Sequence, residues 1–268
     1  MSKHAALDRF GRSGNPLIRS DLFNQTTLDN EDVTTLDGAV NKTAILLALT
    51  VSTAAISWNF QGPTISLVSA LGMGAAFISA LATFGLWIFR WIIKPSPHRA
   101  PYTAPIYAIG MGFAIGLISE TFESQFPGIV IQAVSLTFFV AASLLLLYKT
   151  GVIRPDQNFL LIMACATLGI FFTYLASFIY AMVTGSSFSI ITDTGLMGIG
   201  FSLFVVAIAA LNLVLDFDII EQAAENRTPK YMEWFGAMAL VATLIWLYLE
   251  ILRSVSYTHL TLPTIYSV

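Results

Sequence analysis

Residues 195–222 read GLMGIGFSLFVVAIAALNLVLDFDIIEQ, an apolar run of about 20 residues that ends with Asp216 and Asp218. A helix of this length crosses a hydrocarbon layer of about 30 Å. Ionisable side chains inside such helices are costly enough to suggest a functional role. The stretch therefore predicts a membrane-spanning helix that carries acidic side chains near one end.

The two aspartates cannot point in the same direction, because residues two apart on an α-helix are separated by about 200°. Asn212 precedes Asp216 by four residues and shares its face, whereas Asp218 shares a face with residues that lead into a charged loop, namely Glu221, Gln222 and Glu225. We therefore expect Asp216 to face the protein interior. The alternative is that both are ordinary carboxylates of the lipid headgroup region at a helix end.

The composition indicates an integral membrane protein, expected as a multi-pass protein in the bilayer of the cell (inner) membrane. Of the 268 residues, 56% are hydrophobic and 11% are charged, compared with about 25% charged residues in soluble domains. Cys165 is the single cysteine and the three histidines lie outside the predicted spans. No CxxC, HExxH, GxGxxG or P-loop pattern is present. We therefore expect no enzyme activity, catalytic residue or cofactor, and no nucleic-acid partner.

Six further apolar runs accompany the first one. They predict spans at about 43–60, 64–93, 103–122, 127–148, 158–184 and 231–253. The sequence thus predicts an all-α, seven-helix membrane domain over residues 41–254, preceded by a soluble, flexible tail at 1–40. From about Ser254 onward we expect the chain to leave the helix, and residues 255–268 resemble a non-native tail from translated cloning DNA.

Small residues recur every four positions in two of these spans. They are Gly72, Ala76 and Ala80 in the second span and Ala108, Gly112 and Gly116 in the third. Such stripes let membrane helices approach closely, so we expect packing contacts there rather than ligand sites.

The cations fall almost entirely on one side of this seven-span arrangement. Twelve of the 13 Lys and Arg residues lie on the N-terminal side and only Arg253 on the other, so the positive-inside rule predicts a cytoplasmic N-terminus. Asp216 and Arg90 then lie near the inner ends of their spans, where they could meet. Glu120, Glu123, Glu250 and Arg253 lie near the outer end. Glu250 and Arg253 could pair across three residues, but we expect this outer set to be solvated at the interface.

Several long motifs are similar to one known family. They include LDGAVNKTAILLAL at 36–49, PGIVIQA at 127–133, GIGFSLFVVAIAALNLVLDFDIIE at 198–221 and PKYMEWFGAMAL at 229–240. These residues resemble the Bax inhibitor (Bax inhibitor-1/YccA-like) family of multi-pass membrane proteins, in its bacterial branch. The resemblance covers about residues 33–254.

The resemblance implies a seven-helix fold whose last helix is largely surrounded by the others, and a pH-sensitive calcium leak. In such proteins an acid on the sixth helix shares a proton with an acid on the seventh, and an arginine at the end of the second helix latches them. Asp216 matches the first acid and Arg90 matches the arginine. Thr243 occupies the position of the second acid, so the pair of carboxylates is incomplete. Glu233 lies near the same end but at a different helical position.

Two hypotheses from different classes follow. The first is a cation leak gated at the cytoplasmic end, with Asp216, Arg90, Asn212 and Thr243 along the pathway and with calcium or protons as the transported species. Asp216 would be a transient calcium ligand, since carboxylates are the hard oxygen ligands that calcium prefers. The secondary candidates are Asp218, Glu233, Glu120, Glu250 and Arg253. The second hypothesis is a membrane-embedded regulator or inhibitor of another membrane protein, such as a quality-control protease.

Overall fold

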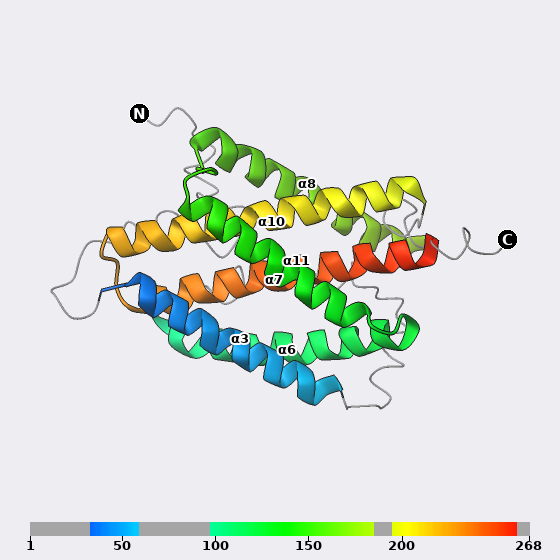
Figure 1. Ribbon diagram of the computed structural model, residues 1–268, viewed down its shortest axis with the longest axis horizontal. Helices are drawn as coiled ribbons and strands as arrows, with labels where there is room; N and C mark the ends of the chain where they lie inside the picture. The colour runs from blue at the N-terminus through cyan, green and yellow to red at the C-terminus, as the bar shows by residue number, and fades with distance from the viewer. Residues whose placement is uncertain (1–32, 59–96, 185–194, 262–268) are drawn as a thin grey trace.

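The computed structural model describes residues 33–58, 97–184 and 195–261. These residues form an all-α bundle (Figure 1). Its elements are α3 (Leu36–Trp58), the short 3-10 helix η1 (Pro97–Arg99), α6 (Ala100–Gln125), α7 (Ile129–Lys149), α8 (Gln157–Thr184), α10 (Leu196–Glu225) and α11 (Tyr231–Thr261). The six α-helices of the described residues are all long and apolar enough to cross a membrane.

Six of the seven predicted spans correspond to one helix each. The predicted second span, with Gly72, Ala76, Ala80 and Arg90, lies outside the described residues. The first span begins earlier than expected, at Leu36 instead of about residue 43. An acid in the first helical turn, here Asp37, is favoured by the helix dipole. Ala39 and Thr43 are buried in this early segment, so packing also supports it.

The last helix lies at the centre of the bundle, as expected. Of the membrane-length window in α11, 94% is buried, whereas no other described span exceeds 56%. It packs against α3, α6, α7 and α10, and Figure 1 shows it running through the middle of the molecule. A helix that is apolar on all sides lies either in a protein core or in a membrane, and α11 is the described span that the other helices surround.

The expectation that the chain leaves the helix at about Ser254 is wrong. The helix α11 continues to Thr261, and Ser254 and Ser256 are buried. The Ser256 hydroxyl donates a 2.7 Å hydrogen bond to the Arg253 carbonyl, which satisfies this polar group within the helix. The first helix-breaking residue after α11 in the sequence is Pro263, and the residue before a proline disfavours helical geometry.

The helices α3 and α6 approach closely through the small residues of α6. A Cβ atom at Gly112 would overlap Thr50 and Thr53 of α3, and one at Gly116 would overlap Ala54 and Ser57. This contact confirms that the small stripe of the third predicted span is a packing surface, of the kind that lets membrane helices meet without a gap.

Candidate functional site

Polar side chains occupy one buried face of α10. Ser202, Val205, Ala209, Asn212 and Asp216 follow each other at spacings of three and four residues, which places them on one face of a helix. All five are at most 1% exposed. At a rise of 1.5 Å per residue, Ser202 and Asp216 are about 21 Å apart along the helix. The face therefore carries polar groups through much of the hydrocarbon layer.

The two aspartates of α10 point in different directions, as the helical phase predicts. Asp216 is fully buried and Asp218 is half-buried. Asp218 accepts hydrogen bonds from the Tyr148 hydroxyl of α7 at 3.4 Å and from Gln222 at 2.6 Å. Tyr148 also donates to Glu221. The predicted orientation of both acids is confirmed, and Asp218 belongs to the contact between α10 and α7.

Asn212 connects the buried face of α10 to α8. Its Nδ2 atom donates to the Thr167 hydroxyl at 3.1 Å and to the Ile208 carbonyl at 2.8 Å. Thr243 lies 12 residues into α11, and Asn212 lies 13 residues before the end of α10, so the two are about level in this antiparallel pair of helices. Thr243 is buried and its hydroxyl donates to the Ala239 carbonyl at 3.2 Å. At the height of Asn212 along the bundle, the buried polar groups are therefore the Asn212 amide and the Thr167 and Thr243 hydroxyls, and not a second carboxylate.

Arg90, the expected partner of Asp216, lies outside the described residues. The structure thus places the acid of the predicted pair but not the arginine. Within the described residues, no group of three or more His, Cys, Asp or Glu side chains is arranged to hold a metal ion. A calcium ion at Asp216 would have to draw its other ligands from backbone carbonyls, hydroxyls, the Asn212 amide or water.

The expected solvation of Glu250 and Arg253 at the interface is wrong. Glu250 is 0% exposed and Arg253 is 4% exposed, and they form an ion pair at 2.5 Å. The Tyr174 hydroxyl of α8 donates to Glu250 at 2.8 Å, and Trp246 donates to it at 3.3 Å. The Arg253 guanidinium lies 5.4 Å from the centroid of the Tyr174 ring. Both charges are buried because α11 is central and continues for two turns beyond Arg253.

The other two acids near this end have ordinary surroundings. Glu120 is half-buried, as a residue at the interface would be. The Glu123 carboxylate accepts hydrogen bonds from the backbone N–H groups of Gly128 at 2.6 Å and Val130 at 3.0 Å. These groups lie at the start of α7 and have no partner inside that helix. Glu123 therefore caps α7 and has a structural role.

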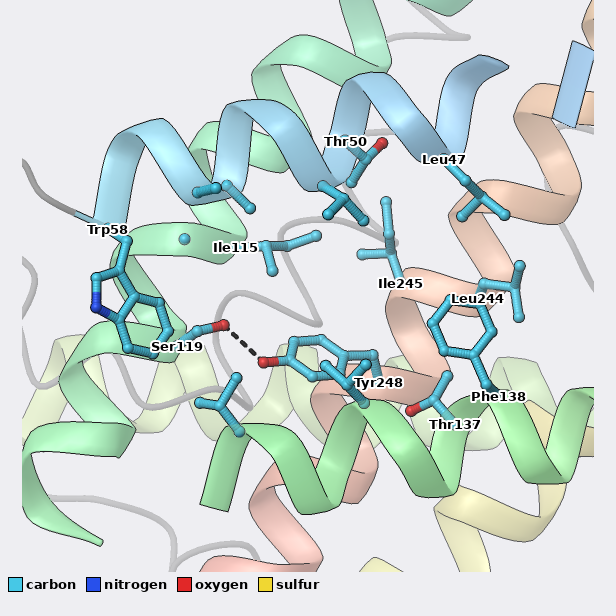
Figure 2. Close-up of a pocket in the computed structure, with 16 residues that line it drawn as sticks. Leu47, Thr50, Trp58, Ile115, Ser119, Thr137, Phe138, Leu244, Ile245 and Tyr248 are labelled. Carbon is cyan, nitrogen blue, oxygen red and sulfur yellow. Dashed lines mark hydrogen bonds between the residues drawn. The ribbon is translucent and has the colours of Figure 1, made fainter. Parts of the chain in front are cut away.

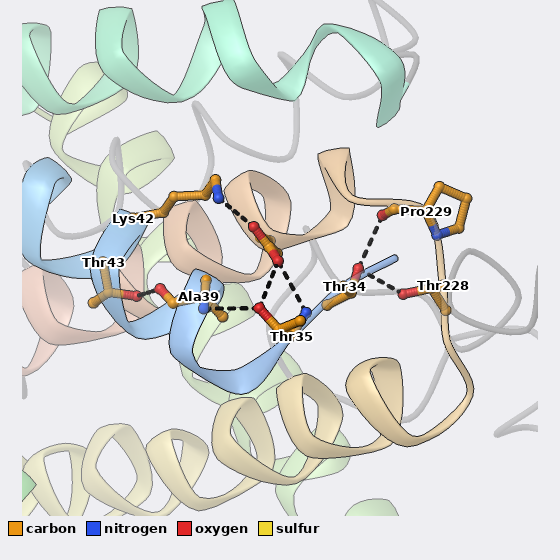
Figure 3. A network of polar contacts seen from close by, with 9 residues as sticks. Thr34, Thr35, Ala39, Lys42, Thr43, Thr228 and Pro229 are labelled. Carbon is orange, nitrogen blue, oxygen red and sulfur yellow. Dashed lines mark hydrogen bonds and ion pairs between the residues drawn. The ribbon is translucent and has the colours of Figure 1, made fainter. Parts of the chain in front are cut away.

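Glu233 belongs to a network at the opposite end of α11, which we name the N-terminal clasp (Figure 3). Its carboxylate forms an ion pair with Lys42 and accepts hydrogen bonds from the backbone N–H of Thr35 at 2.9 Å and the Thr35 hydroxyl at 3.0 Å. Thr34 bonds to the loop between α10 and α11 through the carbonyls of Thr228 and Pro229. A Cβ at Gly38 would overlap the Glu233 carboxylate. Glu233 thus links α11 to α3 and to the residue before it through Lys42 and Thr35.

Sequence reasoning missed three residues that join these groups: Thr167, Tyr174 and Trp246. A tyrosine or tryptophan deep inside an apolar span is a usable signal, since a buried O–H or N–H group usually finds a hydrogen-bond partner. Trp246 also precedes Glu250 by four residues, the spacing at which side chains meet on a helix. Thr167 gives no such signal, because threonine commonly bonds to its own helix.

We name the buried polar groups of these three helices the polar column. It consists of Asp216, Asn212 and Ser202 on α10, Thr167 and Tyr174 on α8, and Thr243, Glu250 and Arg253 on α11. The apolar residues Val205 and Ala209 separate Ser202 from Asn212 and Asp216 on α10.

Comparison with protein families gives a match over most of the chain. A family model described as Bax inhibitor 1 like matches residues 15–259, more than nine-tenths of the chain. A search of curated proteins found no match.

Proposed function

The chain belongs to the Bax inhibitor 1-like family, and from this premise we propose that the multi-pass membrane protein is a pH-sensitive leak pathway for cations, calcium in particular. The pathway follows the polar column, and the gate lies at the inner end, where Arg90 would latch Asp216. The membrane is the cell (inner) membrane, with the N-terminus in the cytoplasm, as the one-sided cations favour.

The observation that carries this proposal is the buried polar face of α10. Polar groups in a membrane interior are costly unless they are hydrogen-bonded, and ionisable ones typically mark ion or proton pathways. A helix that served only as a structural wall would gain stability from apolar residues at positions 202, 212 and 216. Their oxygen atoms are instead the type of ligand that a calcium ion exchanges for water.

The closed state follows from a single gate at the inner end of the column. At the inner end, an ionised Asp216 paired with an arginine cannot accept a passing cation. Farther out, Val205 and Ala209 form a short apolar step and Arg253 neutralises Glu250, so this part of the column slows a cation without closing the pathway. Protonation of Asp216 removes its charge and releases the latch, so acid opens the gate.

The experiment is calcium flux into vesicles that contain the purified full chain and a calcium indicator. We expect flux above that of empty vesicles on acidification. Asn212→Leu should reduce it, because this change removes the only amide that links α8 and α10 among the described contacts of the column. Asn41→Leu is the matched control, because Asn41 is exposed on α3, and it should keep the wild-type flux.

Two results would exclude a leak through the column. One is wild-type flux equal to that of empty vesicles at every pH. The other is equal flux from Asn212→Leu and wild type. The regulator hypothesis would then take its place, and deletion of residues 1–32 followed by binding measurements with membrane proteases would test it.

A further inference from the structure

A second feature lies on the side of α11 away from the polar column. It is a cavity of about 270 Å³ between α3, α6, α7 and α11 (Figure 2). Leu244, Ile245 and Tyr248 line it from α11, and Val134 and Phe138 line it from α7. Thr243 and Glu250 point to a different face of α11, so the cavity and the polar column contact the central helix from different sides.

The hydroxyl groups that line this cavity already have hydrogen-bond partners in the protein. The Thr50 and Thr137 hydroxyls donate to carbonyls of their own helices, at 2.9 and 2.7 Å. Ser119 and Tyr248 bond to each other at 2.6 Å, as Figure 2 shows. A buried water needs two to four polar partners. All four hydroxyls are bonded within the protein, so the cavity favours an apolar occupant over water.

The mouth of the cavity opens between two membrane spans. Val51 of α3 is 59% exposed and Phe138 of α7 is 49% exposed, and both line the cavity. In a bilayer these side chains contact lipid tails. The cavity is therefore continuous with the lipid-facing surface of the bundle.

The depth of the cavity matches one leaflet. Its lining on α3 runs from Trp58 to Leu47, which is about 16 Å along a helix. Tryptophan at the end of a span is typical of the membrane–water interface, and half of a hydrocarbon layer measures about 15 Å. A chain that enters at the level of Trp58 would reach the bilayer midplane at Leu47.

We propose that this cavity is a binding site for one acyl chain of a membrane lipid, taken from the leaflet that surrounds the C-terminal end of α3. The headgroup lies at the level of Trp58 and the chain lies between α3 and α7, in contact with Leu244 and Ile245 of α11. The site is independent of the leak proposed above.

The test uses the full chain in vesicles made of phosphatidylcholine with a photoreactive diazirine on one acyl chain. After illumination, labelled residues are mapped by peptide mass spectrometry. Lipid on the outer surface can label α3 and α7, but Ile245 and Tyr248 are at most 8% exposed and can be labelled only from within the cavity. We expect labelling at 244–248, and labelling should move from Ser119 and Tyr248 toward Leu47 and Leu244 as the diazirine moves from the headgroup to the chain end.

Val134→Trp should fill the cavity and abolish the labelling at 244–248, while labelling of exposed α3 and α7 residues persists. Ile131→Trp is the matched control, because Ile131 lies on the same helix, is 67% exposed and does not line the cavity. It should retain the labelling. The shift of labelled residues with diazirine position can be measured in wild type alone, so it tests the proposal even if neither variant folds. If residues 244–248 of wild type are not labelled, the proposal is overturned. This result is expected when another part of the chain fills the cavity. Labelling there that persists in a folded Val134→Trp variant also overturns the proposal.

Discussion

Glu233 and Glu250 are both buried carboxylates on α11, yet they are stabilised in different ways. Glu233 lies at the edge of the bundle, where its partner Lys42 is 17% exposed and two further hydrogen bonds come from Thr35. Glu250 lies in the interior, where its partner Arg253 is only 4% exposed. A buried pair is costly to desolvate and contributes little net stability, but removal of one partner leaves an uncompensated charge. The two pairs should therefore respond differently to mutation.

Arg253→Met should destabilise the protein by about 3–5 kcal/mol, because it leaves the Glu250 carboxylate buried without a cation. The double variant Arg253→Met with Glu250→Gln should recover most of this loss, since no buried charge remains. The measurement is unfolding in detergent. Glu120→Gln serves as a control for loss of an acid, and its change should stay within about 0.5 kcal/mol. Wild-type stability for Arg253→Met would mean that the pair is solvated after all.

At the scale of the helices, the close contact of α3 with α6 depends on glycines of α6, which have no side chain to separate the two helices. Gly116→Ala places a methyl group against Ala54 and Ser57 of α3, and Gly110→Ala on the same helix meets nothing within 4 Å. Overpacking of this kind costs about 1–3 kcal/mol. We therefore expect Gly116→Ala to lower the melting temperature in detergent and Gly116→Leu to lower it further.

The paired substitution at Gly110 controls for the loss of a glycine. Gly110→Ala should leave the melting temperature unchanged or raise it slightly, because alanine is the better helix former. Equal melting temperatures for the two alanine variants would contradict a tight α3–α6 contact.

Six helices could be predicted from the sequence because each is a long apolar run, and length and apolarity are local properties. The orientation of Asp216 and Asp218 could be predicted for the same reason, since helical phase depends only on spacing. The depth of Glu250 and Arg253 could not, because it depends on α11 being surrounded by four other helices and on its extension to Thr261. The bond from Asn212 to Thr167 could not be predicted either, since it depends on how two separate helices are aligned along their length.

For the whole molecule, the predicted topology depends on the distribution of cations. Twelve of the 13 Lys and Arg residues fall on one side of a seven-span arrangement. Reporters fused after Gln61, Ser124 or Ser187 should therefore lie outside, and those after Pro97, Gly151 or Asn226 should lie inside. An export-dependent enzyme and a cytoplasm-dependent fluorescent protein, fused at the same sites, give complementary readings. Two or more reversed sites would contradict seven spans with the N-terminus inside.

The polar column has the acid Asp216 toward one end and the neutralised Glu250–Arg253 pair toward the other. Asp216 is fully buried and Asp218, two residues later, is half-buried and bonded to Tyr148. The same substitution at these two positions therefore separates the effect of the buried acid from that of a lost negative charge near the same end of the helix.

The most direct measurement is calcium flux into vesicles as a function of pH for wild type, Asp216→Asn and Asp218→Asn. Wild type should be closed at neutral pH and open as acid protonates Asp216. Asp216→Asn mimics the protonated acid, so its flux should be high at every pH, while Asp218→Asn should follow the wild-type profile. An Asp216→Asn profile identical to that of wild type, or a loss of pH dependence in Asp218→Asn alone, would contradict a gate at Asp216.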